Sequence, residues 1–270
     1  MPEYERISLD VADGVATLTF TVPELSNALD IDALQEVMDA LYRIEKRDDV
    51  GALVLTGEGD RAFCAGINLK EVPLDAGEAE IDHHFRYKAM WWHQFMHKLI
   101  RIRLPVLSAV NGVAAGGGFG IVLASDMAVC VDSARFLCTW HANGVANDGA
   151  TSYTLAKIVG FRRAMELMLT NQTVGAEQAL EWGIVNRVYS QAEFAEHVAT
   201  IAADLAAGPT HLQAMAKERF HMGWRQSIEE CTEYEIQNIM DSLEHPYFQA
   251  SLRRFVNKEG KNDQVKVRLP

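Results

Sequence analysis

The chain has 270 residues, of which 49% are hydrophobic and 23% charged, so it can bury a full core as one large domain or one domain plus an appendage. Its net charge of −12 argues against nucleic acid or an anionic membrane as the main partner, because both select basic surfaces, whereas an anionic small molecule needs only a local basic patch. The four cysteines show no CxxC spacing, the N-terminus lacks a signal-peptide pattern, and no stretch approaches about 18 uninterrupted apolar residues, so we expect a cytoplasmic protein without a membrane span.

The N-terminal part predicts a strand, a helix and a second strand in that order. Val15–Phe20 alternates apolar and Thr residues, and Asp30 is expected to cap a helix that runs to about Ile44. Gly51–Thr56 is a short buried strand, and this order indicates a right-handed βαβ crossover. The loop Phe63–Leu69 (FCAGINL) could present backbone N–H groups to an anion or could be an ordinary packed loop.

A long helix with one apolar ridge is expected from about Glu80 to Arg103. His93 and His97 are four residues apart, a spacing that can bind zinc, but HExxH is not matched and no third ligand stands out. His93 lies beside the aromatic part of the ridge, where it could be a general base with a pKa near neutrality or an ordinary surface or core histidine.

The segment Asn111–Gly120 (NGVAAGGGFG) follows the strand Val106–Val110 and leads into apolar Ile121–Ala124. Three consecutive glycines between a strand and a helix could aim the free N–H groups of the first helical turn at a negative charge. A tight turn in which the glycines serve packing is the alternative. Neither GxGxxG nor GxxxxGK[ST] fits, so a dinucleotide or P-loop site is disfavoured.

Two further extended segments, Met127–Val131 and Ala134–Cys138, are followed by a loop to Gly149 and a helix from Ala150. Asp148 stands just before that helix. It could be the N-cap of the helix, or a buried carboxylate with a chemical role.

Beyond Glu193 the pattern is helical throughout. We expect helices over Phe194–Ala207, from Pro209 to about Leu243, and over Pro246–Phe255. Such an extension normally packs on a partner subunit or caps the first domain.

The chain contains seven short motifs, in this order: PELSNAL, ALVLTG, FCAGINL, PVLSAVNGVAAGGGFG, ASDMAV, MELMLT and AxxxGIVNRV. Together they resemble the crotonase (enoyl-CoA hydratase/isomerase) superfamily over essentially the whole chain. The resemblance implies an α/β fold, a crotonase-like spiral of ββα turns with a C-terminal helical region. It implies a core domain over residues 1–205, a helical trimerisation region over 206–270, and a homotrimer or larger homo-oligomer.

The same resemblance implies an acyl-CoA thioester substrate, with coenzyme A as part of the substrate and no separate cofactor or metal. The thioester carbonyl would be polarised by two backbone N–H groups, those of Ile67 and Gly117, which form an oxyanion hole. Hydratases of the superfamily carry two Glu residues where this chain has Gly120 and Trp140.

WWHQ and WHANGVANDGATSY are instead similar to members that hydrolytically dehalogenate 4-chlorobenzoyl-CoA to 4-hydroxybenzoyl-CoA and chloride. In that reaction Asp148 would displace the halide through an aryl-aspartyl ester, and His93 would activate water to hydrolyse the ester. Another crotonase-type isomerase or hydrolase, and a non-catalytic CoA-binding subunit, are the alternatives.

The resemblance also implies substrate-contacting residues, although Phe85 and Trp92 could equally be plain core. Trp140 would orient Asp148 and help wall the ring pocket. The substrate-binding residues would be Phe85, Trp92, Gly116 and Trp140, and the CoA-binding residues Ala65 and Lys70.

Three positions depart from the pattern or fit it weakly. Ile67 stands where an aromatic residue is expected, so pocket shape and halogen preference are open. No Arg precedes Asn27, so CoA phosphate contacts are expected to shift to Lys70 or to basic residues of a neighbouring subunit. Glu235 matches a polar residue near the site, but an exposed helical Glu is the alternative. The basic residues of a neighbouring subunit that could contact the CoA phosphates are Arg253, Arg254 and Lys258.

Overall fold

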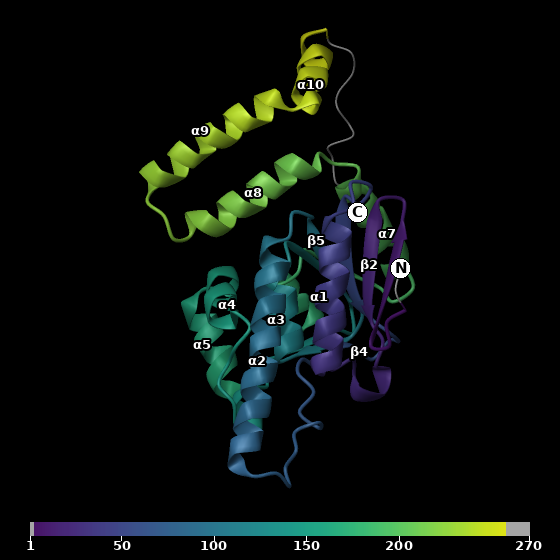
Figure 1. Ribbon diagram of the computed structural model, residues 1–270, viewed down its shortest axis with the longest axis vertical. Coiled ribbons are helices and arrows are strands. Elements are labelled where there is room, and N and C mark those ends of the chain that lie inside the picture. The colour runs from purple at the N-terminus through teal and green to yellow at the C-terminus, as the bar shows by residue number, and fades with distance from the viewer. Residues whose placement is uncertain (1–2, 258–270) are drawn as a thin grey trace.

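The computed structural model describes residues 3–257 and contains two β-sheets with helices packed around them (Figure 1). The larger sheet has the strand order β1-β2-β3-β5-β7-β10, and only its β1–β2 pair is antiparallel. Its strands are β1 (Ile7–Ala12), β2 (Val15–Phe20), β3 (Ala52–Gly57), β5 (Val106–Val110), β7 (Met127–Val131) and β10 (Arg187–Tyr189). The smaller sheet has the order β4-β6-β8-β9, with β8–β9 antiparallel. It consists of β4 (Ala62–Cys64), β6 (Val113–Ala115), β8 (Arg135–Leu137) and β9 (Thr173–Gly175).

The chain visits the two sheets alternately and then forms a helix, which confirms the expected spiral of ββα turns. β3 and β4 precede α2, β5 and β6 precede α3, and β7 and β8 precede α4. The helices of this part are α1 (Ile31–Glu45), α2 (Glu78–Arg101), α3 (Gly117–Ala124), α4 (Thr151–Val159), α5 (Phe161–Thr170), α6 (Ala176–Glu181) and α7 (Phe194–Ala206).

Local signals in the sequence account for the first of these units. The Asp30 side chain accepts a hydrogen bond from the Ala33 N–H at 2.8 Å, so the predicted N-cap of α1 is confirmed. β2 and β3 pair in parallel on either side of α1 in the chain, as the predicted βαβ order requires. The N-terminal strand β1, which sequence reasoning did not anticipate, pairs with β2 in the register Ile7↔Phe20 to Ala12↔Val15.

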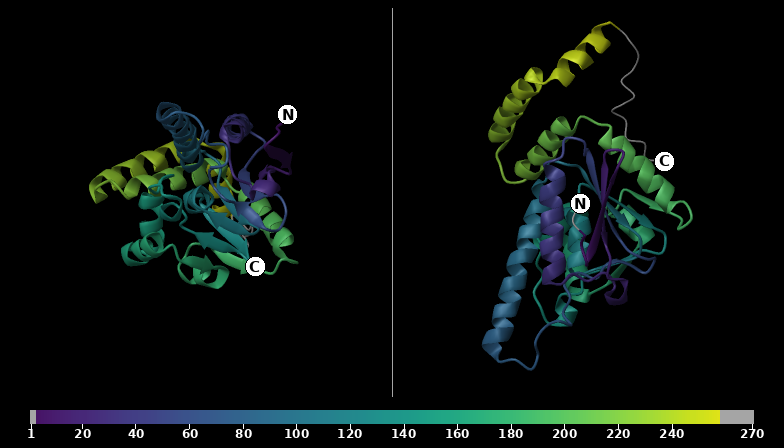
Figure 2. Two further views of the ribbon diagram at one scale, coloured as in Figure 1. Left: turned by 90° about the horizontal axis from the view of Figure 1, so that it is seen from below. Right: turned by 45° about the vertical axis from the view of Figure 1, so that its right-hand side comes forward.

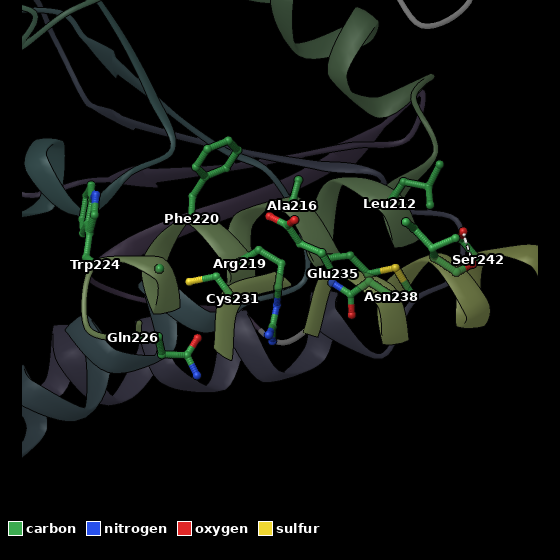
Figure 3. A pocket seen from close by; sticks show the side chains of 13 residues that line it. Leu212, Ala216, Arg219, Phe220, Trp224, Gln226, Cys231, Glu235, Asn238 and Ser242 are labelled. Carbon is green, nitrogen blue, oxygen red and sulfur yellow. Dashed lines mark hydrogen bonds between the residues drawn. The ribbon is translucent and has the colours of Figure 1, made fainter. Parts of the chain in front are cut away.

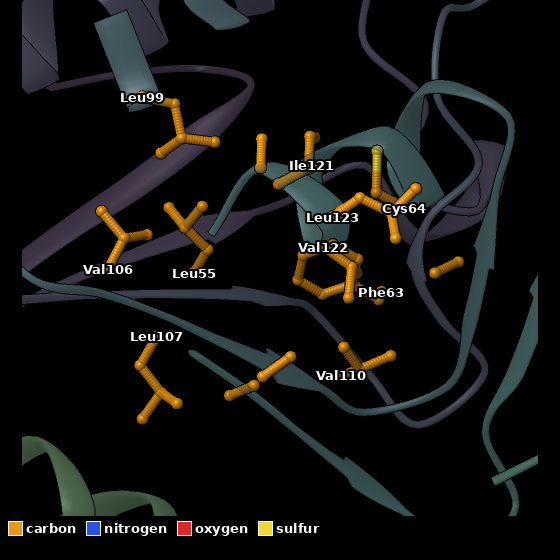
Figure 4. Close-up of a cluster of buried hydrophobic side chains, with 14 of the residues drawn as sticks. Leu55, Phe63, Cys64, Leu99, Val106, Leu107, Val110, Ile121, Val122 and Leu123 are labelled. Carbon is orange, nitrogen blue, oxygen red and sulfur yellow. The ribbon is translucent and has the colours of Figure 1, made fainter. Parts of the chain in front are cut away.

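The helix α3 lies in the centre of the core, and every one of its residues is buried. It contacts β4, β5, β6, α2 and α4, which a helix that is apolar all round can do. Figure 4 shows Ile121, Val122 and Leu123 packed among side chains of the neighbouring strands. A methyl group at Gly118 would lie 1.9 Å from the Cys64 carbonyl oxygen, so only glycine lets the start of α3 lie against the end of β4.

The last three helices stand away from the sheets (Figures 1 and 2) and contain no buried residue. They are α8 (Thr210–Gly223), α9 (Ile228–Glu244) and α10 (Pro246–Val256). The single helix predicted from Pro209 to Leu243 is therefore wrong. The chain breaks before α9, where Ser227 and Glu230 form a capping box.

A few polar contacts tie this helical region to the core. The Lys217 ammonium contacts the Leu99 carbonyl at 3.2 Å and the Asp126 carboxylate at 2.8 Å. The domain boundary after residue 205 stays a prediction, and the end of the predicted trimerisation region, residues 258–270, lies outside the described residues. None of the helices in the described part is long and apolar enough to cross a membrane.

Candidate active site

The backbone N–H of Ile67 is free because its loop pairs with the segment before α1. The Leu29 N–H donates to the Gly66 carbonyl at 2.7 Å, and the Asn68 N–H donates to the Leu29 carbonyl at 2.8 Å. Within one trans peptide the C=O and N–H point to opposite sides, so the Ile67 N–H points away from Leu29. It finds no acceptor in the described part of the chain.

The N–H of Gly117 belongs to the first turn of α3, where helical amides have no intrahelical partner. The Gly116 carbonyl accepts a hydrogen bond from the Gly120 N–H at 3.0 Å along the helix. The Gly117 N–H lies in the same peptide plane and therefore points the other way, out of the N-terminal end of α3. A methyl group at Gly66 would lie 2.5 Å from the Gly117 nitrogen. The two loops therefore touch, and Ile67 and Gly117 line one cavity.

Gly116 adopts φ 52° and ψ −121°, a conformation that glycine tolerates and other residues rarely adopt. A methyl group there would also lie 2.9 Å from the Thr139 hydroxyl. Gly116, the first glycine of the triplet, is thus required by backbone conformation as well as by space.

The cavity has a volume of about 140 Å³ and mainly apolar walls. An apolar cavity of about 150 Å³ holds one benzene molecule, so the space suits a single aromatic ring. All the predicted substrate-binding residues, Phe85, Trp92, Gly116 and Trp140, line it, together with Ala65. Trp92 and Trp140 are buried, and Phe85 is half-buried.

The half-buried side chain of Asp148 points into this cavity and accepts a hydrogen bond from the Trp140 indole N–H at 2.9 Å. It is not the N-cap of α4, because Ala150 occupies that position and only the backbone carbonyl of Asp148 binds Thr151. The cap interpretation is therefore wrong. Asp148 is the one acidic side chain among the described residues that line the cavity.

Burial raises the pKa of the Asp148 carboxyl, because a buried carboxylate loses its hydration. Four groups oppose this shift: the Trp140 hydrogen bond first, then the charge of His93, the nearby Trp92 indole N–H and the backbone N–H of Asp148 itself. The Trp92 nitrogen is buried and makes no hydrogen bond within the described residues. A methyl group at Gly149, which has φ 61°, would lie 2.9 Å from that nitrogen, so glycine allows the close approach.

His93 occupies a different place from the other candidates. It is exposed and does not line the cavity, yet it is close enough for its charge to lower the pKa of Asp148. His97 lies one turn later on α2 and is also exposed. In the part of the chain that the structure describes, no three His, Cys, Asp or Glu side chains are grouped as metal ligands.

The remaining predicted residues lie outside the cavity. Lys70 is exposed at the end of the Ile67 loop. Glu235 lines a separate cavity of about 560 Å³ between α8 and α9 (Figure 3) and is exposed there, which agrees with the exposed helical alternative. Arg253 and Arg254 lie on α10, and Lys258 is outside the described residues.

Two residues that sequence reasoning missed hold the cavity together. Lys88 lines it although it is charged, and Asn68 is buried beside the Ile67 amide. The available signal was the position of Lys88 within the apolar ridge, three residues after Phe85 and four before Trp92, where a lysine must find a buried partner.

Comparison with known proteins shows the family of the chain. Residues 10–263 match the profile of the enoyl-CoA hydratase/isomerase family. Two proteins of Arthrobacter sp, 4-chlorobenzoyl coenzyme A dehalogenase-1 and -2, are each 50% identical over 264 residues, which is 98% of this chain and 95% of each relative. A crystal structure of enoyl-CoA hydratase from Bacillus anthracis superposes with a TM-score of 0.87 at 25% identity, covering 97% of this chain and 100% of that chain. The chain therefore belongs to the enoyl-CoA hydratase/isomerase family.

Proposed function

We propose that the protein hydrolytically dehalogenates 4-chlorobenzoyl-CoA to 4-hydroxybenzoyl-CoA and chloride. The observation that carries this proposal is the placement of one carboxylate, Asp148, in a ring-sized apolar cavity that also holds the free amides of Ile67 and Gly117. The 50% identity to two 4-chlorobenzoyl coenzyme A dehalogenases supports the choice of substrate. This chain has Gly120 and Trp140 at the two positions where hydratases have Glu, which disfavours water addition to an enoyl thioester.

The first step uses Asp148 as a nucleophile. A carboxylate oxygen adds to the ring carbon that bears chlorine, and the displaced electron pair moves through the ring onto the thioester oxygen. The N–H groups of Ile67 and Gly117 stabilise that negative charge. When the electrons return, the carbon–chlorine bond breaks, chloride leaves, and an aryl ester of Asp148 remains.

The second step hydrolyses this ester. His93 accepts a proton from water as the oxygen adds to the ester carbonyl of Asp148. The tetrahedral adduct then breaks down, the phenolic oxygen leaves and takes up the proton from His93 to give 4-hydroxybenzoyl-CoA, and the new carboxyl group of Asp148 loses its proton to water. These steps use only protein groups, water and the thioester itself.

Chloride release distinguishes this function from its alternatives. The purified protein is incubated with 4-chlorobenzoyl-CoA and, separately, with crotonyl-CoA. Chloride and 4-hydroxybenzoyl-CoA from the first substrate would support the proposal. Hydration or isomerisation of crotonyl-CoA without chloride release would favour another crotonase reaction, and binding without turnover would favour a CoA-binding subunit.

The oxyanion role of Ile67 predicts a large loss when its N–H is removed. Replacing Ile67 by 2-hydroxy-3-methylpentanoic acid turns the amide into an ester and keeps the side chain. One such donor contributes roughly 2.7–4 kcal/mol, so kcat should fall about 10²–10³-fold. Ala79 is exposed in the first turn of α2. Its replacement by lactic acid is the matched control, and equal effects of the two replacements would contradict the assignment.

The Trp140 hydrogen bond predicts a change in pH dependence. Trp140→Phe keeps the ring and removes a donor that lowers the pKa of Asp148, so this pKa should rise further. Because only the ionised carboxylate attacks, the acid limb of the kcat/KM profile should move to higher pH. The same bond orients the carboxylate, and a displacement of about 1 Å in a reacting group can lower a rate roughly 10²-fold, so kcat should fall by up to about 10²-fold. Trp182→Phe, at the end of α6, is the control. An unmoved acid limb would refute the positioning role of Trp140.

We also propose that residues 206–270 form the contacts of a homotrimer or larger oligomer. Large apolar side chains exposed on the last three helices support this, with Phe220, Ile228 and Phe255 between 74% and 82% exposed. In such an assembly, Ala65 and Lys70 would contact the coenzyme A moiety, and Arg253 and Arg254 of a neighbouring subunit would reach its phosphates.

The state of the cysteines supports a cytoplasmic location for the protein. All four thiols are free, and three of them, Cys64, Cys130 and Cys138, are buried. Burial raises the pKa of the Cys64 thiol to about 12, which keeps it protonated and unreactive.

A further inference from the structure

Among the described residues, Lys88 is the most deeply buried charged side chain, and the proposed mechanism does not use it. Only 2% of its side chain is exposed, and it lies on the cavity-facing side of α2, one turn before Trp92. A lysine is almost never fully buried unless it is paired, because the charge loses its hydration. Burial accordingly lowers the pKa of Lys88, and the Glu71 carboxylate opposes that shift.

Both partners of Lys88 belong to the loop that carries Ile67. The ammonium donates to the Asn68 carbonyl at 2.6 Å and forms an ion pair with the Glu71 carboxylate. The His84 ring nitrogen approaches the same Glu71 oxygen at 3.9 Å from the preceding turn of α2. Lys88 therefore joins α2 to two points of one loop.

The loop is held on its opposite side by the segment before α1. Leu29 bonds the Gly66 carbonyl and the Asn68 N–H, one on each side of Ile67. The Asn68 side chain also accepts from the Lys70 N–H at 3.0 Å and so closes the turn. The Gly66 carbonyl and the Asn68 N–H on either side of the Ile67 N–H are thus both fixed, and Ile67 lines the cavity.

We propose that Lys88 is a positioning residue that, through its bonds to Asn68 and Glu71, fixes the direction of the Ile67 N–H against the Gly117 N–H. The inference rests on the proposed function, because it assigns these amides to the thioester oxygen. Lys88 acts through the loop and neither donates nor accepts a proton in the reaction.

The expected size of the effect follows from the geometry of catalysis. A displacement of about 1 Å in a positioning group can lower a rate roughly 10²-fold. Lys88→Met keeps the length and the apolar stem and removes the ammonium, which releases the Asn68 carbonyl and leaves Glu71 with only the more distant His84 ring. The variant should lose about 10²-fold in kcat for chloride release, while KM changes much less.

Polarisation of the thioester can be measured without turnover. 4-Methylbenzoyl-CoA has no leaving group, so it stays intact in the cavity, and polarisation of its carbonyl moves its near-ultraviolet absorption to longer wavelength. We expect wild-type protein to produce this shift and Lys88→Met to produce a much smaller one at saturation. Glu71→Gln, which removes the charge from one of the two loop contacts and so weakens it, should give an intermediate shift.

The matched control is Lys98→Met on the same helix. Lys98 is also largely buried and paired with a glutamate, Glu45, but it does not line the cavity. The Lys98→Met variant should have a lowered melting temperature, as Lys88→Met does, and an unchanged absorption shift and kcat.

The outcomes distinguish a positioning role of Lys88 from a purely structural role and from direct contact with the substrate. If Lys88→Met lowers stability but keeps the full shift and kcat, Lys88 is only structural and the proposal fails. If Lys88→Met loses the shift while Glu71→Gln keeps all of it, Lys88 contacts the substrate directly, which also overturns the proposal. Wild-type protein that shifts the absorption but releases no chloride from 4-chlorobenzoyl-CoA would refute dehalogenation alone, and wild-type protein without the shift would refute the oxyanion assignment and the role of Lys88 together.

Discussion

Asp148→Asn is expected to abolish chloride release from 4-chlorobenzoyl-CoA. The neutral amide has the shape of the carboxylate and can still accept the Trp140 hydrogen bond, but it cannot attack the ring carbon. Removing a catalytic nucleophile costs at least roughly 10⁴-fold in kcat. The measurement is chloride release per active site at saturating substrate, including the first turnover.

The same variant carries its own test of folding. Burial raises the pKa of the Asp148 carboxyl above its ordinary value of 3.8, so between these two values the native state binds the proton more firmly than the unfolded chain. Stability therefore falls as the pH rises through that window, and Asn has no charge to bury. Asp148→Asn should melt at a higher temperature than wild type near neutral pH, and the difference should narrow as the pH falls towards 3.8.

Asp132→Asn is the matched control, because Asp132 is exposed just after β7 and should leave both activity and melting temperature unchanged. Chloride release by Asp148→Asn at the wild-type rate would remove the carboxylate from the mechanism. A variant that melts well below wild type would instead mean that the charge is stabilised by its surroundings more than burial destabilises it.

Short-range patterns explain how much of the fold the sequence could predict. The alternation in Val15–Phe20 and the capping Asp30 act on neighbouring residues, and both elements appear as predicted. The apolar run after the glycines predicts a helix, and its lack of a polar face explains why α3 is buried on all sides. The break between α8 and α9 also had a local signal, the Ser227–Glu230 capping box, which the longer helical pattern concealed.

The site depends on contacts between distant segments, which local patterns cannot predict. The FCAGINL loop and the glycine segment were each ambiguous alone, and only the family resemblance joined Ile67 to Gly117. The physical reason for their contact is that Gly66 has no side chain where the Gly117 nitrogen approaches. Asp148 is ambiguous for the same reason, because the cavity that it lines forms only where α2 and the loop before α4 come together.

Lys88 shows the opposite case, in which a pattern is informative but incomplete. A lysine within an apolar ridge indicates either a short gap in the ridge or a buried ion pair. Its partner Glu71 lies in the segment before α2, which contains Pro73 and Gly77 and shows no pattern that would indicate a partner for a buried lysine. The choice between these readings needs the tertiary position of the loop, which the Leu29 contacts determine.

His93→Gln is expected to separate the two steps of the reaction. Asp148 and the oxyanion amides remain intact, so one chloride should leave per active site at nearly the wild-type rate. Hydrolysis of the ester then lacks its general base, and steady-state kcat should fall about 10²–10⁴-fold. The measurement is a burst of chloride equal to the number of sites, with mass spectrometry of the peptide containing Asp148 to detect the aryl adduct.

His97→Gln is the control for this experiment, because His97 lies one turn later on α2, is exposed like His93 and does not line the cavity. It should show neither a burst nor an adduct beyond those of wild type. The position of His93 suits this role, since an exposed imidazole near Asp148 has both access to water and an electrostatic influence on the carboxyl. A His93→Gln protein that turns over at the full rate would assign water activation to another group, whereas one that releases no chloride at all would mean that His93 is needed before the ester forms.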